Sequence, residues 1–178
     1  MSLPRIGVVI VTMGTRPREL DALLASVEKQ DVPTRGVLVG NATPLTEVDA
    51  DVIKIPLEEN LGCPGGRNVG LAMLCESGEV DVVGELDDDG LLMTAFLGGG
   101  HAFSVPMLNE IGLWPAEFFF GHEESDLAWR SLDAGWEILY EPELVLQHPK
   151  ASPARHAVYY RFTARNRVWL ARLRERGL

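Results

Sequence analysis

The sequence predicts an α/β fold in which a mostly parallel sheet is flanked by helices. Continuous apolar, β-branched runs such as "IGVVIVT" (6–12) and "VDVVGEL" (80–86) indicate strands that are covered on both faces. Stretches with helical periodicity lie between these strands, and strands that alternate with helices imply βαβ units. The chain has 178 residues, of which 46% are apolar and 24% charged. This balance suits one globular domain with a substantial core.

The segment that follows the first strand predicts an amphipathic helix. Leucines and a valine recur there at helical spacing between positions 20 and 27. Thr15 is placed to cap this helix, and Pro17 lies in its first turn, where proline is well tolerated. Short strands are expected next, at 36–40 and 51–55.

A glycine-rich turn leads into the next predicted helix. The segment "NLGCPGGRNVGL" (60–71) breaks on its glycines and then turns helical to about Glu76, which puts Arg67 and Asn68 in the first turn. Helix N-termini favour anions, and an arginine there adds charge-assisted hydrogen bonds to phosphate. The segment does not fit the dinucleotide fingerprint G-x-G-x-x-G. The alternative is a flexible turn that carries a surface arginine.

The second half of the chain predicts two further helices and two short strands. "VPMLNEIG" (105–112) is a short helix that ends at its glycine, and "EESDLAWRSLDAG" (123–135) is a helix stopped by its last glycine. Short strands are expected at 136–140 and 144–148. The second of these helices is expected to turn three apolar side chains inward, those of Leu127, Ala128 and Leu132.

A long helix that begins after Pro153 closes the chain and is rich in arginine. Residues 1–150 carry nine Lys/Arg and 25 Asp/Glu, a formal charge of −16, whereas residues 151–178 carry seven Arg and one Glu, a charge of +6. The acidic body argues against nucleic acid as a partner. The basic helix fits a solvated face, a phosphate contact or a membrane-surface patch. Its apolar side is marked by Val158, Phe162, Trp169 and Leu173.

Cysteine usage and hydropathy bear on the cellular compartment. Cys63 and Cys75 are the only cysteines, and they have neither metal-ligand nor disulfide-framework spacing. No apolar run approaches the roughly 18 residues that span a bilayer, and the start of the chain lacks the layout of a signal peptide. We therefore expect a protein of the reducing cytoplasm.

Three adjacent carboxylates, those of Asp87, Asp88 and Asp89, follow directly on a buried strand. Ligands of open α/β sheets bind at the carboxyl ends of the strands, so these side chains are expected to face a cleft. Carboxylates together with substrate phosphates are the usual ligands of Mg²⁺ or Mn²⁺. Acidic triplets also occur in solvated loops, which is the alternative interpretation.

Two glutamates and one histidine are further candidates for chemistry. Glu123 and Glu124 stand between three phenylalanines and a helix. They are either caps favoured by the helix dipole or, beside an aromatic wall, a general base with a raised pKa. Asp126 and Arg130 have the spacing of a structural ion pair. His148 ends the last predicted strand and is either structural or a metal ligand. The other histidines lack such placement: His101, His122 and His156.

Taken in order, these segments resemble the glycosyltransferase family 2 enzymes, which have a GT-A, Rossmann-like fold. The segments that carry the resemblance cover most of residues 6–149: "VVIVTMGTR", "VLVGNAT", "ENLGCPGGRNVGL", "ELDDDG", "LGGGHAFSVPMLNEIG", "FFFGHEESDLAWRSLDAGW" and "LVLQHP". The resemblance implies an inverting hexosyl- or deoxyhexosyltransferase of cell-surface polysaccharide biosynthesis. A UDP- or dTDP-sugar is the expected donor, Mn²⁺ or Mg²⁺ the cofactor, and the hydroxyl of a saccharide or lipid-linked molecule the acceptor.

The resemblance also assigns roles to residues of this chain. Asp87 resembles the first member of the family's D-x-D motif and Asp89 its metal-binding last member, with His148 completing the metal site. The segment "HEESDLAWR" resembles the motif that places the general base at Glu124, with Glu123 beside it. The residues implied to bind the nucleotide sugar are Thr12, Arg16, Asn41, Arg67, Asn68, Asp87 and Asp88.

The chain departs from the family pattern at three places. Gly40 stands where an aspartate near the nucleoside is usual, and Glu124 is one methylene longer than the usual aspartate base. The D-x-D motif and the acceptor segment nearly abut at 90–93, where relatives have several dozen more residues, and we expect an omitted stretch there. The expected organisation is one domain with a nucleotide-sugar half (1–90), an acceptor half (91–149) and a basic helix (150–178).

Two other functions compete with this interpretation. The short junction suits a catalytically silent nucleotide-sugar-binding domain. A phosphate-handling α/β domain that depends on Mg²⁺ needs an aspartate after the first strand, where this chain has Thr12, and therefore ranks last.

Overall fold

The computed structural model describes residues 4–30, 32–88, 91–92, 100–139, 146–147 and 157–175. In this part of the chain, five strands form one sheet in the order β3-β2-β1-β4-β6. They are β1 (Ile6–Thr12), β2 (Thr34–Gly40), β3 (Ile53–Pro56), β4 (Val82–Asp87) and β6 (Gly100–Ser104). The first four pair in parallel, and β6 runs antiparallel to β4. The predicted α/β fold with a mostly parallel sheet is confirmed.

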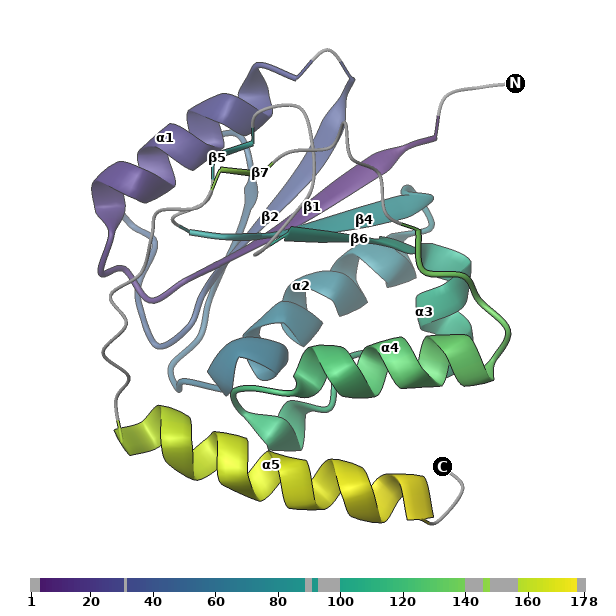
Figure 1. Cartoon of the computed structure of the whole chain (residues 1–178). Helices are drawn as coiled ribbons and strands as arrows, with labels where there is room; N and C mark the ends of the chain where they lie inside the picture. Colours follow the sequence, from purple (N-terminus) through teal and green to yellow (C-terminus); the bar gives the residue numbers. More distant parts are fainter. Residues whose placement is uncertain are drawn as a thin grey trace.

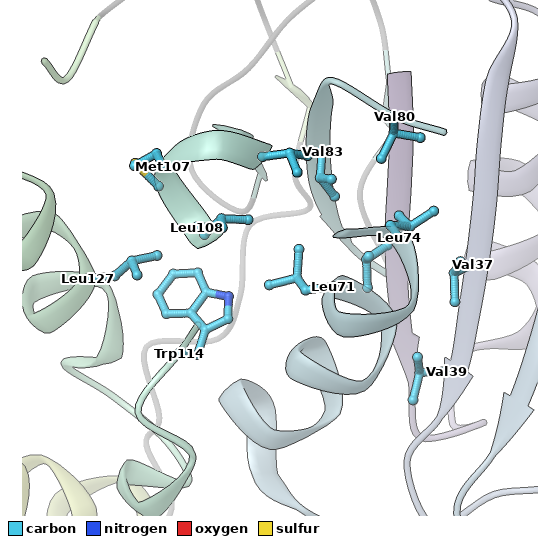
Figure 2. Close-up of a cluster of buried hydrophobic side chains, with 12 residues drawn as sticks. Val37, Val39, Leu71, Leu74, Val80, Val83, Met107, Leu108, Trp114 and Leu127 are labelled. Carbon is cyan, nitrogen blue, oxygen red and sulfur yellow. The ribbon is translucent and has the colours of Figure 1, made fainter. Parts of the chain in front are cut away.

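Helices cover both faces of the sheet, which explains the apolar strands. In Figure 1, α1 (Pro17–Glu28) lies on one face, and α2 (Gly62–Ser77), α3 (Val105–Ile111) and α4 (Glu123–Asp133) lie on the other. Successive residues of β1 alternate between the two cores. Val8 and Ile10 pack with the leucines of α1, whereas Val9 packs with those of α2. The second core extends to Trp114 and is drawn in Figure 2.

Helix α1 is close to its prediction, but its cap is not. The four predicted apolar residues at 20–27 are buried. The N-cap position is Arg16 rather than Thr15, and it makes no side-chain cap hydrogen bond. The predicted cap was therefore wrong. Pro17 begins the helix, and its ring supplies a backbone angle that already suits the first turn.

Helix α2 begins at Gly62, so Arg67 and Asn68 lie beyond its first turn and that prediction was wrong. The glycines serve close packing inside the helix rather than a turn before it. A Cβ at Gly70 would come within 2.5 Å of Val9 Cγ1, and a Cβ at Gly62 within 2.3 Å of the Phe119 carbonyl oxygen. Tertiary contact with β1 and with the segment before α4 therefore decides where the helix begins.

Helix α3 ends at Gly112 as predicted, whereas α4 differs in one inward side chain. Leu127 is buried and Ala128 half-buried, but Leu132 is 51% exposed, so its predicted inward orientation was wrong. The predicted strand at 136–140 is also wrong for residues 136–139, which are irregular. Instead, the Trp136 indole Nε1–H donates to Glu110 at 3.0 Å, which turns this segment back toward α3.

Two short strands form a second sheet, and a long helix ends the described chain. Strand β5 (Leu91–Leu92) pairs antiparallel with β7 (Leu146–Gln147), which falls inside the strand predicted at 144–148. Helix α5 (Ala157–Glu175) lies beyond α4 in Figure 1. Phe162 and Trp169 pack as predicted, against Phe119 and Phe118. Val158 is largely exposed, contrary to its predicted apolar side. None of the described helices has the length and apolar character needed to cross a membrane.

Candidate functional site

The carboxyl ends of β1, β2 and β4 bring most of the predicted site residues to one edge of the sheet. Thr12 pairs with Gly40 in the strand register, and Val11 pairs with Asp87. The backbone N–H of Asn41 donates to the Thr12 carbonyl at 2.8 Å. The structure thereby gathers Thr12, Asn41 and Asp87 where parallel α/β sheets bind their ligands.

Asp88 is held by two candidate residues, Thr12 at the end of β1 and Arg16 after it. The Thr12 hydroxyl donates to Asp88 Oδ2 at 2.7 Å, and Arg16 Nη1 lies 3.6 Å from Asp88 Oδ1. The Thr12 oxygen also accepts the backbone N–H of Gly14 at 3.0 Å, which fixes the turn after β1. Arg16 remains half exposed, whereas Asp88 is mostly buried. A positive charge therefore faces the second carboxylate of the acidic triplet.

Arg67, on α2, forms an ion pair with Asp87, the first carboxylate of the triplet. Its side chain is only 6% exposed, and Nη2 donates to Asp87 Oδ1 at 3.0 Å. Nε lies 3.7 Å from Glu85 Oε2, and the guanidinium carbon lies 5.5 Å from the Trp114 ring centre. Burial alone would lower the pKa of Arg67, but its acidic neighbours raise that pKa above the ordinary value. Arg67 therefore keeps its charge.

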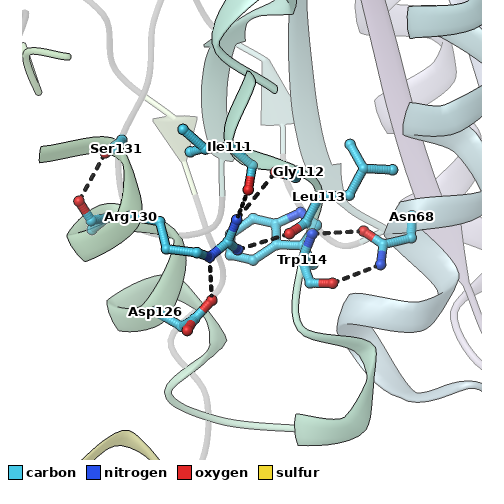
Figure 3. Close-up of polar contacts among 9 residues, drawn as sticks. Asn68, Ile111, Gly112, Leu113, Trp114, Asp126, Arg130 and Ser131 are labelled. Atoms are coloured by element: carbon cyan, nitrogen blue, oxygen red, sulfur yellow. Dashed lines mark hydrogen bonds and ion pairs between the residues drawn. The ribbon is translucent and has the colours of Figure 1, made fainter. Parts of the chain in front are cut away.

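Two predicted ligand residues, Asn41 and Asn68, have structural partners. The Asn41 amide donates to Asn60 Oδ1 and to the Gly62 carbonyl, both at 3.0 Å. Asn68 donates to the Trp114 carbonyl at 2.8 Å and accepts the Trp114 backbone N–H at 2.9 Å, as Figure 3 shows. These bonds tie α2 to the segments on either side of it. The predicted contacts of the two side chains with the donor stay predictions.

Sequence reasoning missed Glu85, a carboxylate in the middle of β4. It is fully buried, and Oε1 accepts the Trp114 indole N–H at 2.7 Å. Burial raises the pKa of Glu85 to about 7, against the lowering effects of Arg67 and of the Trp114 hydrogen bond. The available signal was the acidic residue inside the otherwise uncharged run "VVGEL" (82–86).

The sequence does not indicate a functional position for His101. In the structure it lies on β6 directly opposite Glu85 on β4, so both side chains project from the same face of the sheet. Its Nδ1 is buried and has no hydrogen-bond partner in the described part of the chain. Burial, followed by the charge of Arg67, lowers the pKa of His101. The imidazole is therefore neutral beneath the site.

The first turn of α4 holds the two candidate catalytic glutamates in different environments. Glu123 is 2% exposed, and its Oε2 lacks a hydrogen-bond partner among the described residues. Burial, reinforced by the charge of Glu124, raises the pKa of Glu123 to about 7. Glu124 is exposed. The pair therefore combines a buried group that titrates near neutrality with a group that solvent reaches.

Arg130 and Asp126 form the predicted ion pair, with Nε donating to Oδ2 at 2.8 Å. Arg130 also donates to the backbone carbonyls of Ile111, Gly112 and Leu113 (Figure 3). This side chain therefore fixes α4 against the end of α3 and against the segment that leads to Trp114.

Helix α5 supports the turn that precedes the glutamates. Asn166 is fully buried, and its amide donates to the carbonyls of Phe118, Phe120 and Gly121 at 3.0, 2.9 and 2.7 Å. Arg165 donates to the Phe118 carbonyl at 2.6 Å. These bonds satisfy backbone carbonyl groups of the segment that joins the 3₁₀ helix (Ala116–Phe118) to α4.

Metal ligation is only partly represented in the described residues. Asp87 and Asp88 offer the hard oxygen donors that Mg²⁺ and Mn²⁺ prefer, and the Asp87 side chain is 38% exposed at the sheet edge. Within the described ranges, no group of three or more His, Cys, Asp or Glu is placed to hold a metal ion. The two predicted metal ligands, Asp89 and His148, lie outside these ranges, as do residues 90 and 93 of the 90–93 junction.

No protein-family model and no curated protein matches the sequence. Solved structures do match. The chain is similar to the mannosyltransferase PcManGT from Pyrobaculum calidifontis in complex with GDP-Man and Mn²⁺, with a TM-score of 0.64, 17% identity, and coverage of 82% of this chain and 57% of that one. It is also similar to S. aureus TarS 1-349, with a TM-score of 0.55, 18% identity, and coverage of 72% and 55%.

The chain has the fold of these glycosyltransferases. It spans little more than half of the length of each of the two proteins. The GT-A-like architecture predicted from the sequence is therefore confirmed at the level of the fold. The mannosyltransferase structure holds GDP-Man and Mn²⁺, a nucleotide sugar and a divalent ion of the classes that the family resemblance implies.

Proposed function

We propose that this chain binds a nucleotide sugar at the carboxyl ends of β1, β2 and β4 and transfers the sugar to an acceptor hydroxyl with inversion. One observation carries this proposal: Asp87 and Asp88 end β4 beside Arg67 and Arg16, in a fold shared with glycosyltransferases. One buried and one half-exposed arginine beside two carboxylates suit a diphosphate bound together with a divalent cation. The donor class, UDP- or dTDP-sugar, and the family 2 assignment belong to the proposal.

In this scheme the chain's own residues bind and orient the donor. Arg67, nearly buried and already held by Asp87, faces the diphosphate, and Arg16, half exposed, faces the nucleoside. Asp89 and His148 would hold Mn²⁺ or Mg²⁺ with the help of Asp87. When bound, such an ion stabilises the charge that develops on the departing diphosphate.

Glu124 is the general base of the proposal. A base must reach the hydroxyl whose proton it removes, and Glu124 is the exposed member of the pair in the first turn of α4. It accepts the acceptor's proton as the oxygen attacks the anomeric carbon, so the configuration inverts in this single displacement. Glu123, buried beside it, tunes the local charge because its own protonation changes near pH 7.

Turnover of sugar nucleotides tests this function. We expect release of UDP, dTDP or GDP from the matching sugar nucleotide with Mn²⁺ and a saccharide or lipid-linked acceptor. Glu124→Gln should lower kcat at least 100-fold, since general base catalysis contributes about 10²–10⁴. Asp89→Ala should abolish the stimulation of turnover by Mn²⁺. An unchanged rate in Glu124→Gln would remove the base assignment.

A silent nucleotide-sugar-binding domain is the second candidate, favoured by the short 90–93 junction between the acidic triplet and the acceptor segment. The two candidates differ in one result. A binding domain would take up a nucleotide diphosphate with Mn²⁺ and still show no turnover with any acceptor.

The outward face of α5 is proposed to contact an anionic membrane from the cytoplasmic side. Arg161, Arg167 and Arg172 are exposed there, and Tyr160 and Val168 beside them are 62% and 50% exposed. Arginines mixed with apolar side chains suit the boundary between lipid headgroups and acyl chains. Vesicles that contain anionic lipid should sediment the protein at low salt, and Arg→Gln changes at the three arginines should release it. Binding that ignores both salt and these changes would contradict the contact.

A further inference from the structure

A buried carboxylate in β4 is not required by the fold. Val83 and Leu86 on the same strand are buried among apolar side chains, and an apolar residue at position 85 would continue that pattern. Removing a carboxylate from water has a cost that a nearby arginine only partly offsets, so buried ion pairs are weak evidence for stability. The position of Glu85 therefore calls for another explanation.

Glu85 joins two side chains that also contact each other. Its Oε1 accepts the Trp114 indole N–H at 2.7 Å, and its Oε2 lies 3.7 Å from Arg67 Nε. The Arg67 guanidinium lies over the Trp114 ring at 5.5 Å. Asn68, the next residue on α2, donates to the Trp114 backbone carbonyl and accepts the Trp114 backbone N–H. Arg67 and Trp114 are thus each fixed by at least two partners.

This frame determines which edge of the guanidinium is left for a ligand. Arg67 Nη2 donates to Asp87 Oδ1, and Nε forms an ion pair with Glu85 Oε2 at 3.7 Å without a hydrogen bond. Nη1 is buried and has no hydrogen-bond partner among the described residues. The guanidinium is rigid and planar, so its hydrogen bond to Asp87 and its ion pair with Glu85 together set the direction of Nη1. A phosphate that binds such a fork depends on this direction, because the hydrogen bonds are geometrically specific.

We propose that Glu85 is a positioning residue, which holds Arg67 so that its Nη1 donor serves the diphosphate of the nucleotide sugar. The inference rests on the proposed function, because it assigns Arg67 to the donor. The inference goes further than the proposed function because Glu85, which does not contact the donor, contributes to the affinity for the diphosphate. Glu85 acts here through Arg67 and does not touch the donor.

The main test compares Glu85→Gln with the wild-type protein in calorimetric titrations with UDP, dTDP and GDP, each with Mn²⁺ at about pH 8, where Glu85 with its pKa of about 7 is mostly ionised. The amide side chain keeps an acceptor for Trp114 and removes the charge that holds Arg67. We expect affinity for the preferred diphosphate to fall about tenfold or more, while affinity for the matching monophosphate falls less than threefold. Glu85→Asp keeps the charge and should recover part of the loss.

Two further variants separate positioning from general damage. Val83→Ala lies on the same strand and the same face of the sheet, and it removes core packing without touching the ion pair. It should lower the melting temperature and leave the ratio of diphosphate to monophosphate affinity unchanged. Arg67→Met and Glu85→Gln should not be additive when combined, because both act through one guanidinium.

Three results would decide against the inference. Wild-type affinity in Glu85→Gln would overturn it, and so would an equal loss of diphosphate affinity in Val83→Ala. Additive effects of Arg67→Met and Glu85→Gln would also overturn it. If the wild-type protein bound no nucleoside diphosphate with Mn²⁺, the proposed function would fail first and the inference with it.

Discussion

The indole N–H of Trp114 reaches across from the segment after α3 to Glu85 in the middle of β4, at 2.7 Å. This hydrogen bond joins two residues that are 29 positions apart in the sequence. It satisfies one oxygen of a carboxylate from which water is excluded. The bond also brings the Trp114 ring under Arg67, so the core and the candidate site share one set of contacts.

Trp114→Phe should therefore destabilise the protein. The change keeps an aromatic ring but leaves a buried carboxylate without its donor, which typically costs about 1–3 kcal/mol in the free energy of unfolding. The matched control is Trp136→Phe, whose indole donates to Glu110 at an exposed position and should cost less than about 0.5 kcal/mol. Urea unfolding of both variants measures the difference. Equal losses would contradict the structural role of the Trp114 bond.

Asn166→Ala should loosen the turn that precedes α4. The change removes an amide that donates to three carbonyl groups, and we expect a loss of about 2–3 kcal/mol in unfolding free energy. Arg167→Ala on the exposed side of the same helix should stay within about 0.5 kcal/mol of the wild type. Because the turn leads into Glu123, kcat should also fall in Asn166→Ala. A variant as stable as the wild type would show that α5 does not hold this turn.

The stability of the protein should fall as pH rises from about 4.5 to about 7. Glu85 and Glu123 have folded pKa values of about 7, above the value of 4.5 for an unperturbed glutamate. The folded state therefore binds more protons than the unfolded state in this range, and the stability present below pH 4.5 is lost as the groups ionise. The upper limit is on the order of 3 kcal/mol for each group, since one pKa unit is about 1.4 kcal/mol.

Unfolding free energies at pH 5 and pH 7.5 measure this dependence. Glu123→Gln should stabilise the protein more at pH 7.5 than at pH 5, because the amide has no proton to lose. A gain that is the same at both pH values would mean that Glu123 ionises normally in the folded protein.

The sequence predicted the elements whose signals are local. The apolar strand at 6–12 and the helix over 20–27 form because their own side chains repeat with the right period. The position of the candidate site at the carboxyl edge of the sheet could also be predicted, because the acidic triplet begins at the end of a buried strand. The Asp126–Arg130 pair lies within one helical turn and was equally visible.

The features that could not be predicted from the sequence depend on contacts between residues far apart in the chain. The glycines before Arg67 were interpreted as a turn, although they belong to α2, where Gly62 packs against Phe119 and Gly66 against Val11. The run at 136–139 resembles a strand, but the Trp136 indole binds Glu110 instead. Glu85 has no charged or aromatic partner nearby in sequence, so its role becomes visible only when β4, α2 and Trp114 are assembled.

The most direct test of the proposed function is a calorimetric titration of UDP, dTDP and GDP into the wild-type protein and into Asp87→Asn, with and without Mn²⁺. We expect one diphosphate to bind with a Kd in the micromolar range when Mn²⁺ is present, and we expect omission of the ion or the Asp87 change to weaken binding at least tenfold. Binding of none of the three, or affinity that neither the ion nor Asp87 alters, would contradict it.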